Sequence, residues 1–162
     1  MNSVGTRQID KVRFVQALAP VLPSTSAGVY VSLKNYNHVT VLISVKNATT
    51  VTGSAITLKQ ATAVAGTNEK ELAFTKVWAN IDTAASDNLV ETAVVSNTFT
   101  TNSTNSKNLL YVIEVDTTDL DVTNGFDCFR VGLATGVAMV ADVVYILSGA
   151  RYASPTKSAL TD

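Results

Sequence analysis

The chain has little of what cross-links or activates a small domain. It contains one cysteine, one histidine, one tryptophan and three prolines among 162 residues. Because Cys128 is alone, an internal disulfide is excluded and the hydrophobic core must hold the fold. The shortage of cysteine is compatible with synthesis in a reducing cytoplasm.

Charge of either sign is also scarce. Charged residues make up 15% of the sequence, and 12 basic against 13 acidic residues give a formal net charge of −1. A broad positive field that attracts a phosphate backbone is therefore lacking, and we expect no direct binding to nucleic acid. Residues 131–147 are apolar almost throughout, yet Asp142 would lie in hydrocarbon and Gly132 and Gly136 break the run, so we expect no membrane span.

Motifs of catalytic and cofactor sites are missing, including Gly-rich phosphate loops, paired CxxC and HExxH. Any hydrolase triad would need His38, which alternates onto one strand face with Thr40 and Ser44, and we interpret it as a surface histidine. Cys128 alternates with Arg130 and is interpreted as a small, semi-buried hydrophobic residue that faces a second layer or an interface. We therefore expect no enzymatic activity, no catalytic residue and no cofactor.

Four aspartates gather around one loop, where carboxylate oxygens could hold calcium. Their spacing lacks the alternating ligands and the closing glutamate of an EF-hand, and aspartate is an ordinary turn-former. We therefore predict turn residues and no metal site. The four are Asp116, Asp119, Asp121 and Asp127.

Apolar residues reach 46% of the chain, and threonine and valine are abundant. Both are β-branched, so they lose rotamer freedom in helices and pack well on a pleated sheet. Alternation with period two, broken by Gly, Asn, Ser and Pro, predicts an all-β fold of about nine strands, arranged as a sandwich or a barrel. The predicted strands are residues 12–18, 29–33, 39–46, 55–61, 72–78, 92–101, 109–116, 128–134 and 137–147.

Two of these strands show the plainest alternation. Val29, Val31 and Leu33 share one face, and the alternate residues of 39–45 share one face of the next strand, so both faces should line the core. Residues 34–37 are predicted to be a short polar connection. Residues 79–91 and 97–108 carry no core pattern and are predicted loops.

The strand predicted at 137–147 is apolar on both faces apart from Asp142. Val143 and Tyr145 alternate with Val144 and Ile146, so one set cannot share a single-sided core with the other. Such a strand lies between two layers, or one of its faces packs against another chain.

Four stretches carry a resemblance to a known class of proteins: residues 11–18 (KVRFVQAL), 36–41 (YNHVTV), 56–61 (ITLKQA) and 144–152 (VYILSGARY). They resemble the small auxiliary proteins of tailed bacteriophage virions, in particular capsid decoration or cement proteins. The resemblance implies a β-sandwich, jelly-roll-like body, often a homotrimer, that is made in the host cytoplasm and sits on the capsid surface of the virion. Its implied partner is the major capsid protein, and its implied role is to stabilise contacts between capsid subunits.

No interior linker is evident, so we predict one domain over residues 1–162, with an N-terminal arm at 1–11 and a C-terminal tail at 153–162. The arm, the doubly apolar strand and the C-terminal end are the expected contacts with another subunit or with the capsid. The residues chosen for them are Arg7, Lys11, Arg13, Val140, Val144, Ile146, Arg151 and Tyr152.

Two other functions remain open. One is a different virion component, such as a tail or head-to-tail connector protein, which has the same physics but another symmetry. The other is a carbohydrate-binding or adhesin module, which needs two coplanar aromatic side chains on one open surface. Only Trp78, next to the polar loop, is predicted to be exposed in that way.

Overall fold

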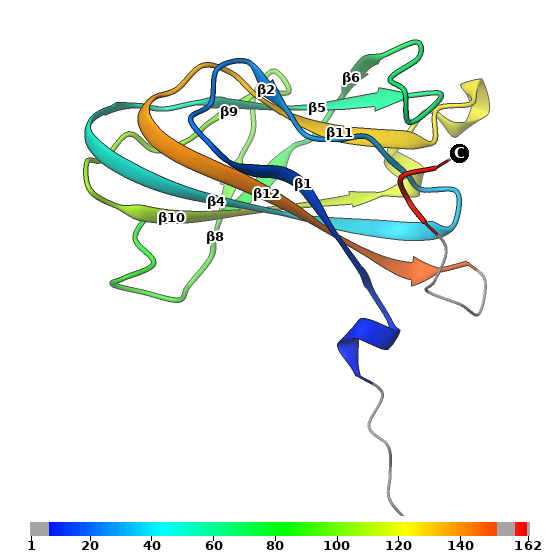
Figure 1. Cartoon of the computed structure of the whole chain (residues 1–162), viewed down its shortest axis with the longest axis horizontal. Coiled ribbons are helices and arrows are strands. Elements are labelled where there is room, and N and C mark those ends of the chain that lie inside the picture. The colour runs from blue at the N-terminus through cyan, green and yellow to red at the C-terminus, as the bar shows by residue number, and fades with distance from the viewer. Residues whose placement is uncertain (1–6, 152–157, 162) are drawn as a thin grey trace, which may run out of the picture.

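A computed structural model describes residues 7–151 and 158–161 as a β-sandwich of two antiparallel sheets (Figure 1). The expected all-β class and sandwich architecture are confirmed. The larger sheet, sheet A, has the strand order β1 (Arg13–Val21), β12 (Val137–Ala150), β4 (Tyr36–Thr52), β10 (Asn108–Asp116), β7 (Lys76–Asn80) and β8 (Val90–Ala93). Sheet B has the order β2 (Ser26–Ala27), β11 (Cys128–Leu133), β5 (Ala55–Ala61) and β6 (Lys70–Leu72), with β3 (Val31–Ser32) paired to β11 and β9 (Phe99–Thr100) to β5.

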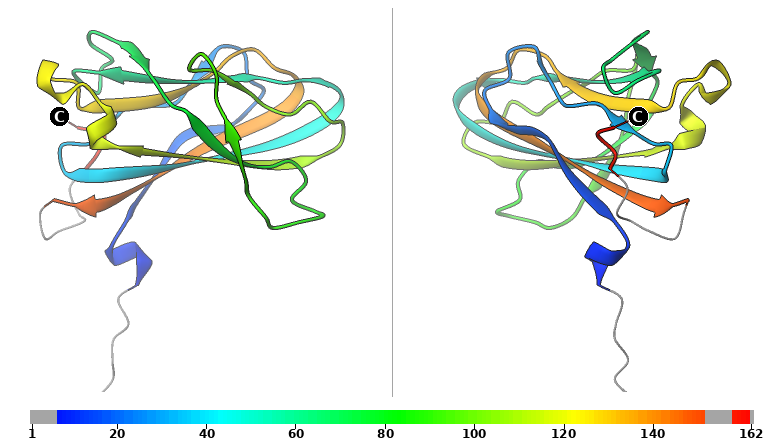
Figure 2. Two further views of the ribbon diagram at one scale, coloured as in Figure 1. Left: turned by 180° about the vertical axis from the view of Figure 1, so that it is seen from behind. Right: turned by 45° about the vertical axis from the view of Figure 1, so that its right-hand side comes forward.

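Besides the strands, the described chain contains three short 3₁₀ helices. They are η1 (Gln8–Asp10), η2 (Thr117–Asp119) and η3 (Val122–Asn124). No helix in the described part of the chain is long and apolar enough to cross a bilayer. The two sheets lie one above the other, with sheet A as the lower layer in the views of Figures 1 and 2.

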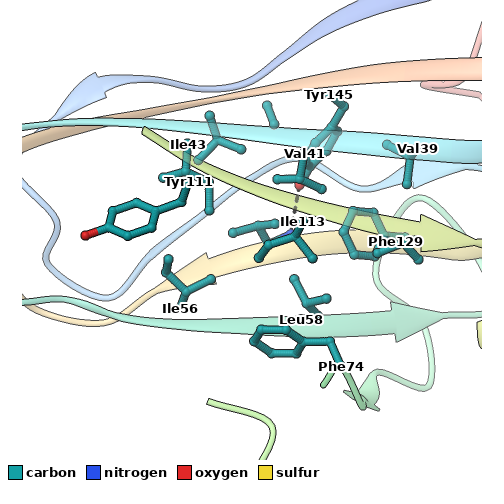
Figure 3. Close-up of a cluster of buried hydrophobic side chains, with 14 of the residues drawn as sticks. Val39, Val41, Ile43, Ile56, Leu58, Phe74, Tyr111, Ile113, Phe129 and Tyr145 are labelled. Atoms are coloured by element: carbon teal, nitrogen blue, oxygen red, sulfur yellow. Dashed lines mark hydrogen bonds between the residues drawn. The ribbon is translucent and has the colours of Figure 1, made fainter. Parts of the chain in front are cut away.

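Strand β4 is the spine of sheet A, because it is the longest strand and pairs with β12 on one side and β10 on the other. Its alternation is nearly complete: Val39, Val41, Ile43 and Val45 are all buried, as predicted. Their side chains meet those of sheet B, including Leu58, in the core between the layers (Figure 3).

Twelve strands replace the nine predicted, because two predicted strands each divide in two and one short strand, β2, lies outside every predicted strand. Residues 72–78 separate into β6 in sheet B and β7 in sheet A, and residues 92–101 separate into β8 in sheet A and β9 in sheet B. Of residues 29–33 only Val31–Ser32 form a strand, β3, which pairs with β11 next to β2. Alternation of side chains reports which face is buried, but it does not report that the chain has changed its partner strand.

Three individual side chains differ from the prediction. Val29 is 45% exposed, because it lies in the break between β2 and β3. Tyr36, predicted in a polar connection, begins β4 and is 1% exposed. Val137 is exposed although Met139 is buried, because the register with β4 shifts between these two residues.

The break between β2 and β3 is closed by a side chain from the other sheet. The backbone N–H of Val131 in β11 donates to the hydroxyl of Tyr145 in β12 at 2.8 Å, and this contact is buried. Gly28 lies over the same hydroxyl, and a Cβ at this position would come within 2.7 Å of it. The hydroxyl thus takes the place of a strand partner for Val131, and the closeness of the backbone requires glycine at position 28.

We expect Tyr145→Phe to lower the free energy of unfolding by about 1–3 kcal/mol, because the ring is retained while a buried N–H loses its acceptor. Chemical denaturation followed by fluorescence or circular dichroism measures the change. Tyr30→Phe is the matched control: the Tyr30 hydroxyl donates to Glu69 at 2.6 Å at an exposed site, and its loss should cost less than about 1 kcal/mol. Equal losses in the two variants would show that the Tyr145 hydroxyl does not join the sheets.

Candidate contact surface

Strand β12 has one face in the core and the other on the outside of the sandwich. Val143, Tyr145 and Leu147 are fully buried between the sheets. Val144 and Ile146 point to the opposite side of sheet A, where they are half-buried, and Val140 is 45% exposed there. The described residues form two sheets and no third layer, so β12 does not lie between two layers of this chain.

We call the side of sheet A that faces away from sheet B the outer face. Pairing aligns one row of side chains across all six strands of this face, and the four central members of the row are apolar. The row runs Gln16, Val144, Leu42, Val112, Trp78 and Glu91.

Apolar side chains also occupy the neighbouring rows of the outer face. Phe14, which is 51% exposed, pairs with Ile146 in the row on one side, and Leu110 lies in the row on the other side. The outer face therefore carries apolar side chains on five adjacent strands, from β1 to β7. Apolar side chains shared by adjacent strands in this way make the outer face a candidate contact surface, although Val112 in the middle of the row is 8% exposed.

One end of the outer face carries a histidine held between two carboxylates. His38 Nδ1 lies 2.8 Å from Asp116 Oδ1, and His38 Nε2 lies 2.5 Å from Glu114 Oε2. Thr40 donates its hydroxyl to the same Glu114 oxygen at 2.8 Å. Because both ring nitrogens face acceptors, the geometry fits the doubly protonated imidazolium, which donates from both nitrogens.

The pKa of His38 follows from this arrangement. Partial burial lowers the pKa, but the hydrogen bonds to Asp116 and Glu114 outweigh burial and raise it above its usual value. His38 was predicted to lie on the surface beside Thr40, which the structure bears out, but the two carboxylates were not predicted. These lie on β10 and become neighbours only through the register of β4 with β10.

The basic residues predicted as contacts lie at one end of β1 and β12. Arg7 and Lys11 are exposed and flank η1, which stands clear of both sheets (Figure 1). Arg13 is half-buried at the start of β1, opposite Leu147. Arg151 follows β12 and donates from Nε to Asn37 Oδ1 at 2.8 Å. Tyr152 lies outside the described residues.

The C-terminal end returns to the body of the sandwich at residues 158–161. Ser32 donates its backbone N–H to the carbonyl of Ala159 at 2.7 Å, and Ala159 is 1% exposed. This part of the predicted tail therefore contributes to the core.

A second polar cluster lies on the outside of sheet B and was not found from the sequence. Glu69 Oε2 accepts hydrogen bonds from the Tyr30 hydroxyl at 2.6 Å and from Arg130 Nε at 3.0 Å, and Lys59 Nζ lies 3.7 Å from Glu69 Oε1. Burial and the hydrogen bond to Glu69 raise the pKa of Tyr30 to about 12. The residues of this cluster are far apart in the sequence and meet only in the folded chain, so no sequence motif could reveal the cluster.

The remaining predicted sites do not assemble into a reaction centre in the described part of the chain. Cys128 is fully buried in sheet B, whereas His38 lies on the outer face of sheet A, so the two do not form a dyad. Asp119 accepts the backbone N–H of Asp116, and Asp121 pairs with Lys70. Among the described residues, no group of three His, Cys, Asp or Glu side chains is placed to hold a metal ion.

Comparison with known proteins gives little further information. No family model matches the chain, and no curated protein matches it. Among solved structures, the chain is similar to the SPBc2 prophage-derived protein YomS, with a TM-score of 0.46 and 14% sequence identity over 90% of this chain and 98% of that one. The name assigns that protein to a prophage, but a likeness this weak carries no argument for the present chain.

The His38 contacts make the stability of the domain depend on pH. Because the folded-state pKa is raised above the unfolded value, the contribution of His38 is fully present below about pH 6.5 and is lost as the pH rises through the folded-state pKa. We expect His38→Gln to destabilise the domain at about pH 6 and to do so much less at about pH 9. Denaturant unfolding of both proteins across this range measures the difference, and a difference that stays constant with pH would contradict a charged His38.

Proposed function

We propose that the chain is a non-enzymatic structural protein of a tailed-phage virion, which binds the outer surface of the capsid and stabilises contacts between capsid subunits. The observation that carries this proposal is the outer face of sheet A, where apolar side chains extend over five strands without a covering layer among the described residues. The sequence resemblance to capsid decoration proteins suggests that the capsid is the assembly this face contacts.

An apolar face of this kind suits a protein that works by contact. Its side chains, including Val144 and Leu42, are half-buried. Association removes such surface from water at roughly 25 cal/mol per Å² of apolar area. On a symmetric shell, modest contacts of this strength add up because many copies act together.

The basic N-terminal segment is proposed to reach the major capsid protein. Arg7, Lys11 and Arg13 precede or begin β1, and antiparallel pairing places the start of β1 beside the end of β12, where Arg151 lies. Four basic residues therefore lie at one end of sheet A. This end can bind a capsid subunit while the outer face, with Val140, Val144 and Ile146, contacts another copy of the chain.

The alternative virion role, in a tail or head-to-tail connector, would use the same outer face with a different symmetry. Imaging of the native particle separates the two, since decoration proteins form knobs on the shell and tail components form rings.

The carbohydrate-binding alternative has less support. Phe14 and Trp78 share the outer face, but four strand spacings separate them, which amounts to roughly 19 Å. These two side chains cannot form one stacking platform for a sugar.

We expect Val144→Asp to leave the domain folded and to weaken its binding to purified capsid shells by at least about tenfold, because assembly would bury an unpaired carboxylate. Co-sedimentation with shells of the source phage measures binding, and circular dichroism verifies the fold. Val122→Asp is the control for an exposed valine outside the outer face and should bind normally. Val143→Asp, in the core, should unfold the domain. If Val144→Asp binds the shells normally, the outer face does not take part in capsid binding.

A further inference from the structure

Asp142 is the acidic interruption of an otherwise apolar strand face. It lies on the outer face of β12 between Val140 and Val144, and it pairs across the sheet with Ser44. Along the same row, Leu110 lies beyond Ser44. A carboxylate therefore stands among apolar side chains in the part of the surface that assembly would cover.

Asp142 has no hydrogen-bond or ion-pair partner in residues 7–151 and 158–161. Its surroundings have already removed part of its hydration, and this partial burial raises the pKa of Asp142 above its usual value. Complete burial of an ionised carboxylate is costly unless a cation meets it. A partner that covers this surface while Asp142 stays ionised must therefore bring a positive charge or hydrogen-bond donors to it, and a positive charge meets it best.

Lys46 supplies the opposite charge on the neighbouring strand. It lies on the outer face of β4, pairs with Val140 and is therefore diagonal to Asp142. No ion pair joins Lys46 to Asp142 in the described structure. Both side chains line one hollow of about 350 Å³ on the outer face, which is also lined by Val140 and Leu110.

A partner for this hollow needs a cation opposite Asp142 and an anion opposite Lys46. A second copy of the chain offers both charges in its own hollow. When that copy is rotated by half a turn about an axis in the plane of the interface, midway between Asp142 and Lys46, its lysine lies opposite Asp142 and its aspartate lies opposite Lys46. In such a contact each residue meets its counterpart reciprocally, as a two-fold interface requires. Sheets that pack face to face also bury more area than sheets that meet at an edge.

We propose that two copies of the chain pair through the outer faces of sheet A, with Asp142 of each copy bound to Lys46 of the other. This inference rests on the proposed function only in taking the outer face as a contact between copies. It replaces the trimer implied by the sequence resemblance, because a sheet face that is covered by one like face is not available to a third copy. Val140 and Leu110 flank the paired charges and exclude water from them.

The test uses two charge-reversing variants of the full chain, Asp142→Lys and Lys46→Asp, with analytical ultracentrifugation over a concentration series. Each variant alone places like charges at both contacts, so we expect the dissociation constant of the pair to rise by roughly a hundredfold. Mixing the two variants restores opposite charges at both contacts, so the mixture should pair about as tightly as the wild type. Recovery on mixing also shows that neither variant is misfolded.

Asp87→Lys is the matched control, because Asp87 lies in the exposed loop between β7 and β8. This variant should pair with itself like the wild type. Mixed with Lys46→Asp it should restore pairing only as far as wild type does, because one of the two contacts keeps like charges. Wild-type protein that stays monomeric at every concentration overturns the proposal. So does pairing that neither reversal weakens, which is the outcome if Asp142 and Lys46 of one chain pair with each other in solution.

A third outcome, in which each reversal weakens association but mixing does not restore it, also overturns the two-fold pair and indicates a contact with a different partner. Capsid co-sedimentation of the wild-type protein keeps this result separate from the proposed function. Pairing with rescue but no capsid binding contradicts the virion role alone. Capsid binding without rescue contradicts the pair alone.

Discussion

The hydrogen bond from the Val131 N–H to the Tyr145 hydroxyl joins the two sheets at a point where no strand offers this N–H a backbone acceptor. Strand β11 has β2 and β3 on one edge, with a break between them, and Val131 lies at that break. The tyrosine reaches it through the core from β12, and Gly28 makes room for the hydroxyl. A buried N–H without an acceptor costs about 1–3 kcal/mol, so this contact restricts how β12 is rotated in sheet A.

That rotation determines which side chains β12 presents to the outside. With Tyr145 directed into the core, alternation sends Val144 and Ile146 to the opposite face, together with Asp142. The pairing of β12 with β4 then aligns Leu42 with Val144 and continues the apolar row into β10 and β7. Which residues form the outer face is thus a consequence of the same register that fills the core.

Alternation in the sequence predicted correctly what depends on one strand alone. The buried side of residues 39–45 and the two apolar sides of 137–147 follow from period two, and the structure bears them out except at Val137. What depends on two strands was missed: the division of 72–78 between the sheets, the carboxylates around His38, and the cluster around Glu69. These features arise from register and from changes of partner strand, for which a single sequence carries no signal.

The polar residues of the outer face would make a contact through this apolar surface specific. His38 and its carboxylates bound the face at one end, and Asp142 and Lys46 interrupt it near the other. An uninterrupted apolar face would associate with any similar surface. A half-buried carboxylate disfavours every partner that has no positive charge opposite it. In the proposed assembly the interruption would weaken each contact, and repetition of that contact over many copies would restore the total strength. A face of this composition is therefore suited to an assembly that forms in one arrangement.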